Sequence, residues 1–131
     1  MKKWILILFV ILLASCDQTA IDEINPYSGR WVIAFKDNSG NIVREGKFTL
    51  QDNGNICSKI EASTTGDSLF FQGNVSSDGG LTGMFGDSCS VNNSGSVSGN
   101  LTELLGIITG TGNWNDTSGS TVSGIWEARR L

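Results

Sequence analysis

The sequence predicts an all-β fold, an eight-stranded antiparallel up-and-down (meander) barrel. Clusters of Asn, Asp, Ser and Gly recur about every 10 to 16 residues from Arg30 onward, and these residue types close tight hairpins. The segments between them are strand-sized, and none has sustained helical periodicity. Short connections make successive strands antiparallel neighbours, and eight such strands are best closed into a barrel. The alternative for the same strands is a two-sheet β-sandwich.

The turn clusters delimit each strand in order. They lie at 37–41, 52–55, 65–67, 77–80, 92–95 and 115–120. The segment "TELLGII" at 102–108, where the sixth strand ends and the seventh begins, could form at most one helical turn. The strands are therefore expected at 30–36, 42–51, 55–63, 68–76, 80–86, 95–102, 106–114 and 121–129. Alternation predicts inward faces made of Trp31, Ile33 and Phe35 in the first strand and of Ile42, Phe48 and Leu50 in the second.

A glycine recurs at an inward position of most strands. The pattern of an apolar residue, Ser or Thr, Gly, any residue and a large apolar residue appears at 81–85 and 97–101, and the closing segment "VSGIW" repeats it at 122–126. Side chains at i and i±2 share a face, so these glycines point inward with the large residues. The inward set is Gly46, Gly73, Gly83, Gly99, Gly110, Gly112 and Gly124. Such a belt lets strands coil sharply and leaves volume near the barrel axis.

Either aromatic rings fill that volume or it forms a ligand cavity. Small barrels commonly pair small residues with large ones, which favours the filled interior. The candidate ligand-binding residues are Trp31, Phe85, Trp114 and Trp126, which could line a pocket for a small apolar or sugar ligand. The same residues are also suited to plug the core.

The N-terminal residues carry an export signal. Lys2 and Lys3 precede an apolar run from Trp4 to Leu13, which is too short to span a bilayer. The run ends in Leu13-Ala14-Ser15-Cys16, which resembles the lipobox of bacterial lipoproteins. The resemblance implies cleavage before Cys16, attachment of a diacylglycerol to its thiol, and a lipid-anchored location in the bacterial cell envelope, with the outer membrane or cell surface favoured.

This reading divides the chain into three parts: a lipoprotein signal peptide at 1–15, a lipidated flexible tether at 16–28, and one barrel domain at 29–131. Loss of Lys2 and Lys3 leaves seven basic residues against thirteen acidic ones, a formal charge of −6. Such a charge argues against nucleic acid or anionic lipid as the partner, because both require a basic surface.

Cys57 and Cys89 form an even pair once Cys16 is lipidated, and an oxidising compartment favours a disulfide between them. Two free thiols or a metal pair are the alternatives, but the chain contains no histidine to complete a metal site or a catalytic Ser-His or Cys-His pair. The carboxylates Asp37, Asp52, Asp67, Asp78 and Asp116 fall in turn clusters, where Asp is favoured for its backbone hydrogen bonds. We therefore expect no cofactor, no metal and no enzymatic activity.

The hairpin sequence from Ser77 to Phe85, with Gly29-Arg30-Trp31, resembles avidin-type and other small meander barrels, although the polar residues that grip biotin have no counterpart. The cysteine pair is also compatible with small barrel-type protease-inhibitor lipoproteins. We expect a non-enzymatic binding role at the envelope, for a small apolar or sugar ligand or for a protein partner. The alternative is an inhibitor of a protease or other hydrolase. A cavity at the glycine belt would favour a carried ligand, and a packed barrel with a protruding segment would favour the inhibitor.

Overall fold

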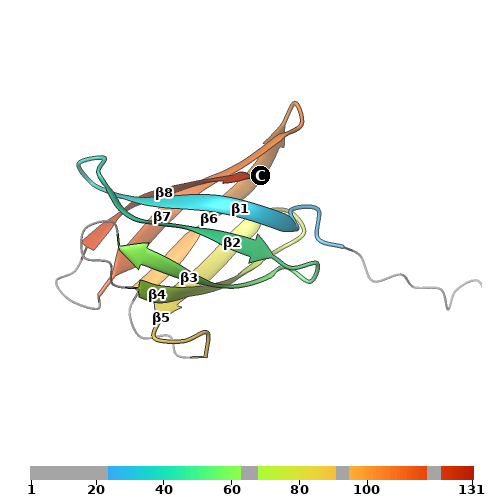
Figure 1. Cartoon of the computed structure of the whole chain (residues 1–131). Helices are drawn as coiled ribbons and strands as arrows, with labels where there is room; N and C mark the ends of the chain where they lie inside the picture. Colours follow the sequence, from blue (N-terminus) through green and yellow to red (C-terminus); the bar gives the residue numbers. More distant parts are fainter. Residues whose placement is uncertain (1–23, 63–67, 91–94, 118–121) are drawn as a thin grey trace, which may run out of the picture.

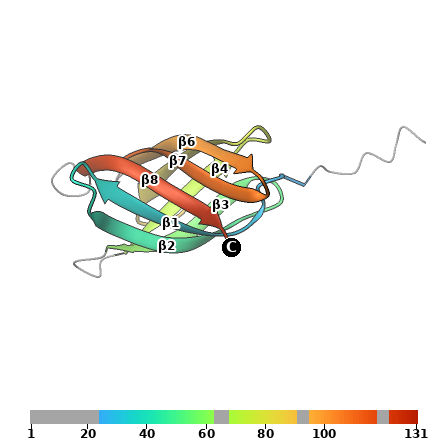
Figure 2. The same cartoon turned by 90° about the horizontal axis from the view of Figure 1, so that it is seen from above.

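The computed structural model describes residues 24–62, 68–90, 95–117 and 122–131, which form an eight-stranded barrel (Figure 1). The strands are β1 (Gly29–Asp37), β2 (Ile42–Leu50), β3 (Asn55–Ala62), β4 (Ser68–Val75), β5 (Gly80–Gly86), β6 (Gly95–Leu104), β7 (Ile107–Asp116) and β8 (Val122–Arg130). Each strand pairs antiparallel with the next, and β8 pairs with β1. The closed barrel, and not the sandwich, is therefore the fold (Figure 2).

Cys16, the signal segment and the predicted turn at 65–67, with Asp67, lie outside the described residues, as do parts of the predicted turns at 92–95 and 115–120. Within the described ranges there is no helix of the length and apolar character needed to cross a membrane.

The two ends of the barrel carry different connections. The chain enters β1 at the end that also carries the β2–β3, β4–β5 and β6–β7 turns and the C-terminus, because alternate strands run in opposite directions. We call this the tether end, and both views place the blue N-terminal segment and the orange β6–β7 turn there (Figures 1 and 2). The opposite, far end carries the β1–β2, β3–β4, β5–β6 and β7–β8 connections.

The alternating apolar residues fill the interior, as the sequence predicts. Trp31, Ile33 and Phe35 of β1 are buried. The ring of Phe35 lies edge-on to the rings of Phe85 and Trp114, with centroids 5.1 and 5.7 Å apart. Edge-to-face pairs of this kind stabilise a core beyond the area that they bury.

The inward glycines make room for one of these rings. A Cβ atom added at Gly99 would lie 2.6 Å from the Trp126 ring, one at Gly110 would lie 3.0 Å from it, and one at Gly112 would lie 2.7 Å from its Nε1. The Trp126 ring therefore occupies a slot that three missing side chains leave. Across the barrel, Gly73 and Gly83 lie opposite each other in adjacent strands. The filled alternative for the glycine belt is the one that the structure adopts.

The slot predicts that alanine substitution destabilises the barrel much more at Gly112 than at Gly46. An added Cβ at Gly112 would overlap the carbonyl oxygen of Ser98 as well as approach Trp126, whereas at Gly46 the nearest atom is a side-chain carbon of Ile60 at 3.4 Å. Gly112→Ala is therefore expected to lower the free energy of unfolding by about 1–3 kcal/mol, as overpacking does. Gly46→Ala serves as the matched control and should change it by less than about 1 kcal/mol. Urea unfolding followed by circular dichroism measures both. Equal effects of the two substitutions would contradict the slot.

The predicted inward face of β2 is wrong at Ile42. The β1–β2 pairing changes from Phe35 opposite Arg44 to Lys36 opposite Ile42, so Val43 is an extra residue on β2. Such a bulge moves the following side chain to the other face of the sheet. Ile42 is accordingly 43% exposed on the outer wall, and Val43 packs against the core instead.

The last residues of the predicted tether belong to the folded domain. The backbone N–H of Asn25 donates to the carbonyl oxygen of Asp52 at 2.8 Å, and its side-chain amide donates to that of Val75, also at 2.8 Å. The indole N–H of Trp31 donates to the carbonyl oxygen of Tyr27 at 2.9 Å. Asn25 is buried although it is polar, because these bonds satisfy it. The segment from Asn25 onward thus packs against the tether end of the barrel.

Asp116 also differs from its predicted place in a turn. It is the last residue of β7, is buried, and lies 3.2 Å from the guanidinium of Arg44, which points inward as the alternation in β2 predicts. A buried carboxylate requires such a partner. The pair closes the far end of the barrel interior.

The β4–β5 turn lowers the pKa of one exposed carboxyl group. The hydroxyl of Ser76 and the backbone N–H of Gly80 donate to the carboxylate of Asp78, and these bonds hold the pKa of Asp78 below its usual range. Because the folded-state pKa is lowered, the stabilisation is present above the ordinary pKa of Asp and is lost as pH falls through the lowered one.

Ser76→Ala is therefore expected to raise the pKa of Asp78 toward its ordinary value, since it removes the hydrogen bond that lowers this pKa most. A carboxyl-carbon NMR titration of Asp78 measures this directly. Ser77→Ala, in the same turn, is the control and should leave the midpoint unchanged. An unchanged midpoint in Ser76→Ala would contradict the assigned cause.

Candidate functional site

The four aromatic residues predicted to line a ligand site lie within the core. Trp31, Phe85, Trp114 and Trp126 are at most 3% exposed. The indole N–H of Trp114 donates to the carbonyl oxygens of Lys36 and Ile125, and that of Trp126 to the carbonyl oxygen of Ser98 at 2.9 Å. Phe85 and Trp114 are in contact, with ring centroids 6.3 Å apart. Their role in binding a ligand stays a prediction, and a ligand there would have to displace packed rings.

The predicted disulfide is present. Cys57 of β3 is bonded to Cys89, which follows β5, with the two Cα atoms 5.8 Å apart. The bond therefore links two segments that stand on either side of β4. Among the described residues, no three His, Cys, Asp or Glu side chains gather closely enough to hold a metal ion.

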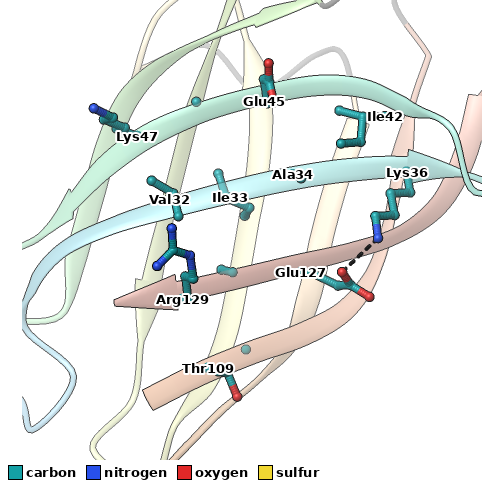
Figure 3. Close-up of a pocket in the computed structure, with 13 residues that line it drawn as sticks. Val32, Ile33, Ala34, Lys36, Ile42, Glu45, Lys47, Thr109, Glu127 and Arg129 are labelled. Carbon is teal, nitrogen blue, oxygen red and sulfur yellow. Dashed lines mark hydrogen bonds and ion pairs between the residues drawn. The ribbon is translucent and has the colours of Figure 1, made fainter. Parts of the chain in front are cut away.

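The outer wall carries a shallow groove of about 800 Å³ over β7, β8, β1 and β2 (Figure 3). We call it the wall groove. Val32 and Ala34, the outward residues of β1, lie along its middle, Thr109 of β7 borders one side, and Ile42 lies toward the far end. Ile42 reaches this surface only because of the bulge in β2. Small apolar side chains thus form a strip that is open to solvent.

Charged residues border this strip in rows of like sign. Val32 lies between Arg129 of β8 and Lys47 of β2, whereas Ala34 lies between Glu127 and Glu45 of the same two strands. Figure 3 shows these side chains on both sides of the β1 ribbon.

The acidic row extends to the next strand and is partly neutralised at its other end. Glu45 lies directly opposite Glu61 of β3. At the other end of the row, Glu127 forms an ion pair with Lys36, with Nζ and Oε2 2.9 Å apart. Like charges directly opposite each other destabilise a sheet. The Glu45–Glu61 pairing therefore works against the stability of the isolated barrel and favours a neighbour that supplies opposite charge.

A second feature is the β6–β7 hairpin, which projects from the tether end. The pairing of β6 with β5 ends at Asn100, and that of β7 with β8 ends at Thr109, so from Thr102 to Ile108 the two strands pair with each other and with no neighbouring strand. Figure 1 shows this orange hairpin reaching past its neighbours. The predicted helical turn in "TELLGII" is wrong, because these residues form a two-stranded projection with a tight turn.

The end of this projection, Leu104–Ile107, is named the hairpin tip. Leu104, Leu105 and Ile107 are 74%, 94% and 66% exposed. Leu105 and Gly106 have φ angles of 53° and 81°, which are left-handed values typical of a two-residue hairpin turn. A leucine rarely adopts such a conformation, whereas Asn does so readily. The composition of the tip is therefore not the one that the turn itself would select.

Replacement of Leu105 with asparagine is expected to stabilise the barrel by about 1 kcal/mol, because it relieves the left-handed strain of a leucine. No packing is lost, since the side chain is 94% exposed. Thermal and urea unfolding of the two proteins provide the comparison. A lower stability of Leu105→Asn would mean that the leucine makes a contact important for the fold.

The chain was compared with known proteins in three ways. A scan against protein-family models, a search of curated proteins and a search of solved structures each found no match.

Proposed function

We propose that this chain is a lipid-anchored protein of the bacterial envelope, held in the membrane through Cys16, whose barrel binds a protein partner at the wall groove. The observation that carries the binding role is the half-buried apolar strip of Val32 and Ala34, which lies between rows of like charge on the outer wall. The filled interior supports an outer site, because the aromatic residues beside the glycine belt occupy the space that a carried ligand would need.

The closed sheet restricts how a partner can bind. At the centre of the wall groove β1 and β8 each pair with a strand on both sides, so a partner strand cannot be added there by backbone hydrogen bonds. The partner must contact side chains only. A surface with small apolar groups at its centre, acidic groups opposite Arg129 and Lys47, and basic groups opposite Glu45 and Glu127 is complementary to the wall groove.

Site-specific photocrosslinking in cells tests this site. A photoreactive amino acid replaces Ala34 in one version of the full chain, and Thr82 on the outer wall of β5 in the control. We expect a discrete crosslinked species from position 34 alone, and its loss when Lys47→Glu and Arg129→Glu reverse the basic row. Crosslinks of equal yield from both positions, or none from position 34, would contradict the wall groove as the site.

Native mass spectrometry of the purified protein distinguishes binding at the wall groove from the carrying of a small ligand inside the barrel. Native mass spectrometry of the folded chain should give the mass of the lipidated, disulfide-bonded protein without a further small molecule. A retained adduct of defined mass would indicate instead that the barrel interior binds a small ligand.

The hairpin tip supports a second candidate, an inhibitor of an envelope hydrolase. A packed barrel with an ordered, protruding segment is the form that this function requires, and β6–β7 supplies one. Inhibition of a purified bacterial envelope protease that is relieved by Leu105→Asp would support this candidate. Equal inhibition by the parent protein and by Leu105→Asp would show that the hairpin tip does not contact the protease.

A further inference from the structure

We propose that the hairpin tip is a second membrane contact, which inserts its aliphatic side chains into the surface of the bilayer to which the barrel is tethered. The inference rests on the proposed lipid anchor at Cys16. It adds an orientation to that anchor, with the tether end of the barrel facing the membrane.

The first argument is the position of the tip. The N-terminal segment is pinned at the tether end by the bonds of Asn25 to Asp52 and Val75. Cys16 precedes Asn25 by nine residues, so even a fully extended chain between them spans no more than about 30 Å. The hairpin tip projects from this same end (Figures 1 and 2). A lipid on Cys16 therefore keeps the tether end of the barrel, from which the tip projects, within reach of the bilayer surface.

The second argument is the chemistry of the tip. Leu104, Leu105 and Ile107 are mostly exposed, and they stand beyond the last paired residues of β5 and β8. Leu104 lies opposite Ile107 across the hairpin, so the tip presents a compact aliphatic cluster. Apolar groups on an otherwise polar projection are suited to the boundary between headgroups and acyl chains, as in interfacial anchors.

Charged residues of both signs surround the tip at the tether end. Arg30 at the start of β1 and Arg129 and Arg130 at the end of β8 are exposed at the tether end. Basic side chains near a membrane surface interact with phosphate groups of lipids. Acidic residues are exposed at the same end: Glu103 next to the tip, Asp52 in the β2–β3 turn and Asp78 in the β4–β5 turn. The three arginines of β1 and β8 can lie at the level of the headgroups when the tip inserts.

Two observations favour lipid over a protein cleft as the occupant. The tip contains only aliphatic side chains, whereas residues that dominate protein interfaces are enriched in Trp, Tyr and Arg. In addition, Leu105 is kept in a left-handed conformation with almost no contact to the barrel. A large apolar side chain at the most exposed point of a projection is suited to insertion into a bilayer, because lipid binding needs apolar area and does not need a shaped pocket.

A fluorescence experiment on the full, exported chain tests the proposal. The protein is extracted from membranes and reconstituted into phosphatidylcholine vesicles with bromine atoms on the upper acyl chains. Leu105→Trp reports on the tip, and Ile125→Trp, on the outer wall near the far end, is the matched control because it too replaces an exposed apolar residue. The native Trp31, Trp114 and Trp126 are buried and give a background that the parent protein measures.

We expect the tryptophan introduced by Leu105→Trp to shift its emission to the blue and to lose about half of its intensity to the bromines, since interfacial groups lie roughly 5–10 Å into the boundary region. The emission from Ile125→Trp should be unaffected. Quenching of both positions, or of neither, would overturn the proposal. An unquenched tip on an anchored barrel would instead be consistent with the second candidate, in which the tip binds in the cleft of a hydrolase.

The mass of the same protein separates this inference from the proposed anchor. A diacylglycerol on Cys16 with a quenched tip supports both, and a diacylglycerol with an unquenched tip overturns only the membrane contact. If Cys16 carries no lipid, the same chain is mixed with the same vesicles. Quenching at the tip then supports the contact while the anchor fails, and absence of quenching overturns both.

Discussion

Trp126→Ala is expected to lower the free energy of unfolding by about 3–5 kcal/mol, the usual cost of removing a buried tryptophan. The ring is 0% exposed and fills the slot beside Gly99, Gly110 and Gly112. The three glycines have no side chains that could move into the vacated volume, so the cavity would persist. The carbonyl oxygen of Ser98 would also lose the indole N–H as its donor. Urea unfolding followed by circular dichroism provides the measurement.

Trp126→Phe is the matched control for this prediction. Phenylalanine keeps an aromatic ring in the slot but cannot donate to the Ser98 carbonyl oxygen, so we expect a smaller loss of about 1–3 kcal/mol. The difference between the two variants separates the filled volume from the hydrogen bond. If Trp126→Ala were no more destabilising than Trp126→Phe, the ring would not be the element that fills the glycine belt.

The double substitution Cys57→Ala with Cys89→Ala has the second large expected effect. The bond closes a loop with a sequence separation of 32 residues. Its removal frees the unfolded chain and should lower the free energy of unfolding by about 3–4 kcal/mol in the chain-entropy model. The folded barrel should remain, because the core residues do not depend on the bond. Circular dichroism in dilute buffer checks the fold, and urea unfolding measures the loss.

The slope of the unfolding transition supplies an internal control for this effect. A chain without the crosslink exposes more surface when it unfolds, so its dependence on urea should be steeper than that of the oxidised protein. An unchanged midpoint and slope would contradict the role of the disulfide. Loss of the folded state in dilute buffer would show that the bond contributes more than loop entropy.

Local patterns were sufficient to predict the strands and their order. The predicted strand at 80–86 has the observed bounds, and most of the others end within one or two residues of the observed ones. Turn residues act over four or five positions, and alternation acts over two, so both signals are contained in short windows of sequence. The inward glycines followed from the same alternation, whereas the Cys57–Cys89 pair followed from the even number of cysteines that remain besides Cys16 in an oxidising compartment.

The candidate sites depend on information that no short window contains. The bulge that moves Ile42 to the outer wall arises from the pairing of β1 with β2, and the bond between Asn25 and Val75 joins residues 50 positions apart. Asp116 falls within a turn pattern, but its partner Arg44 is 72 positions away.

The sequence by itself therefore determined eight antiparallel strands with inward glycines and a pair of cysteines suited to a disulfide, and it favoured a barrel over a sandwich and a filled interior over a cavity. The structure decided these alternatives, since it shows the closed barrel, the ring of Trp126 in the glycine slot and the Cys57–Cys89 bond. Only the tertiary structure decided which surfaces remain open: Val32 becomes the centre of a basic row because β8 closes onto β1, and the hairpin tip is exposed because β5 and β8 end before it does. The physical reason is that strand propensity and alternation are local properties. Register, closure and the relative lengths of neighbouring strands are set by contacts between distant parts of the chain.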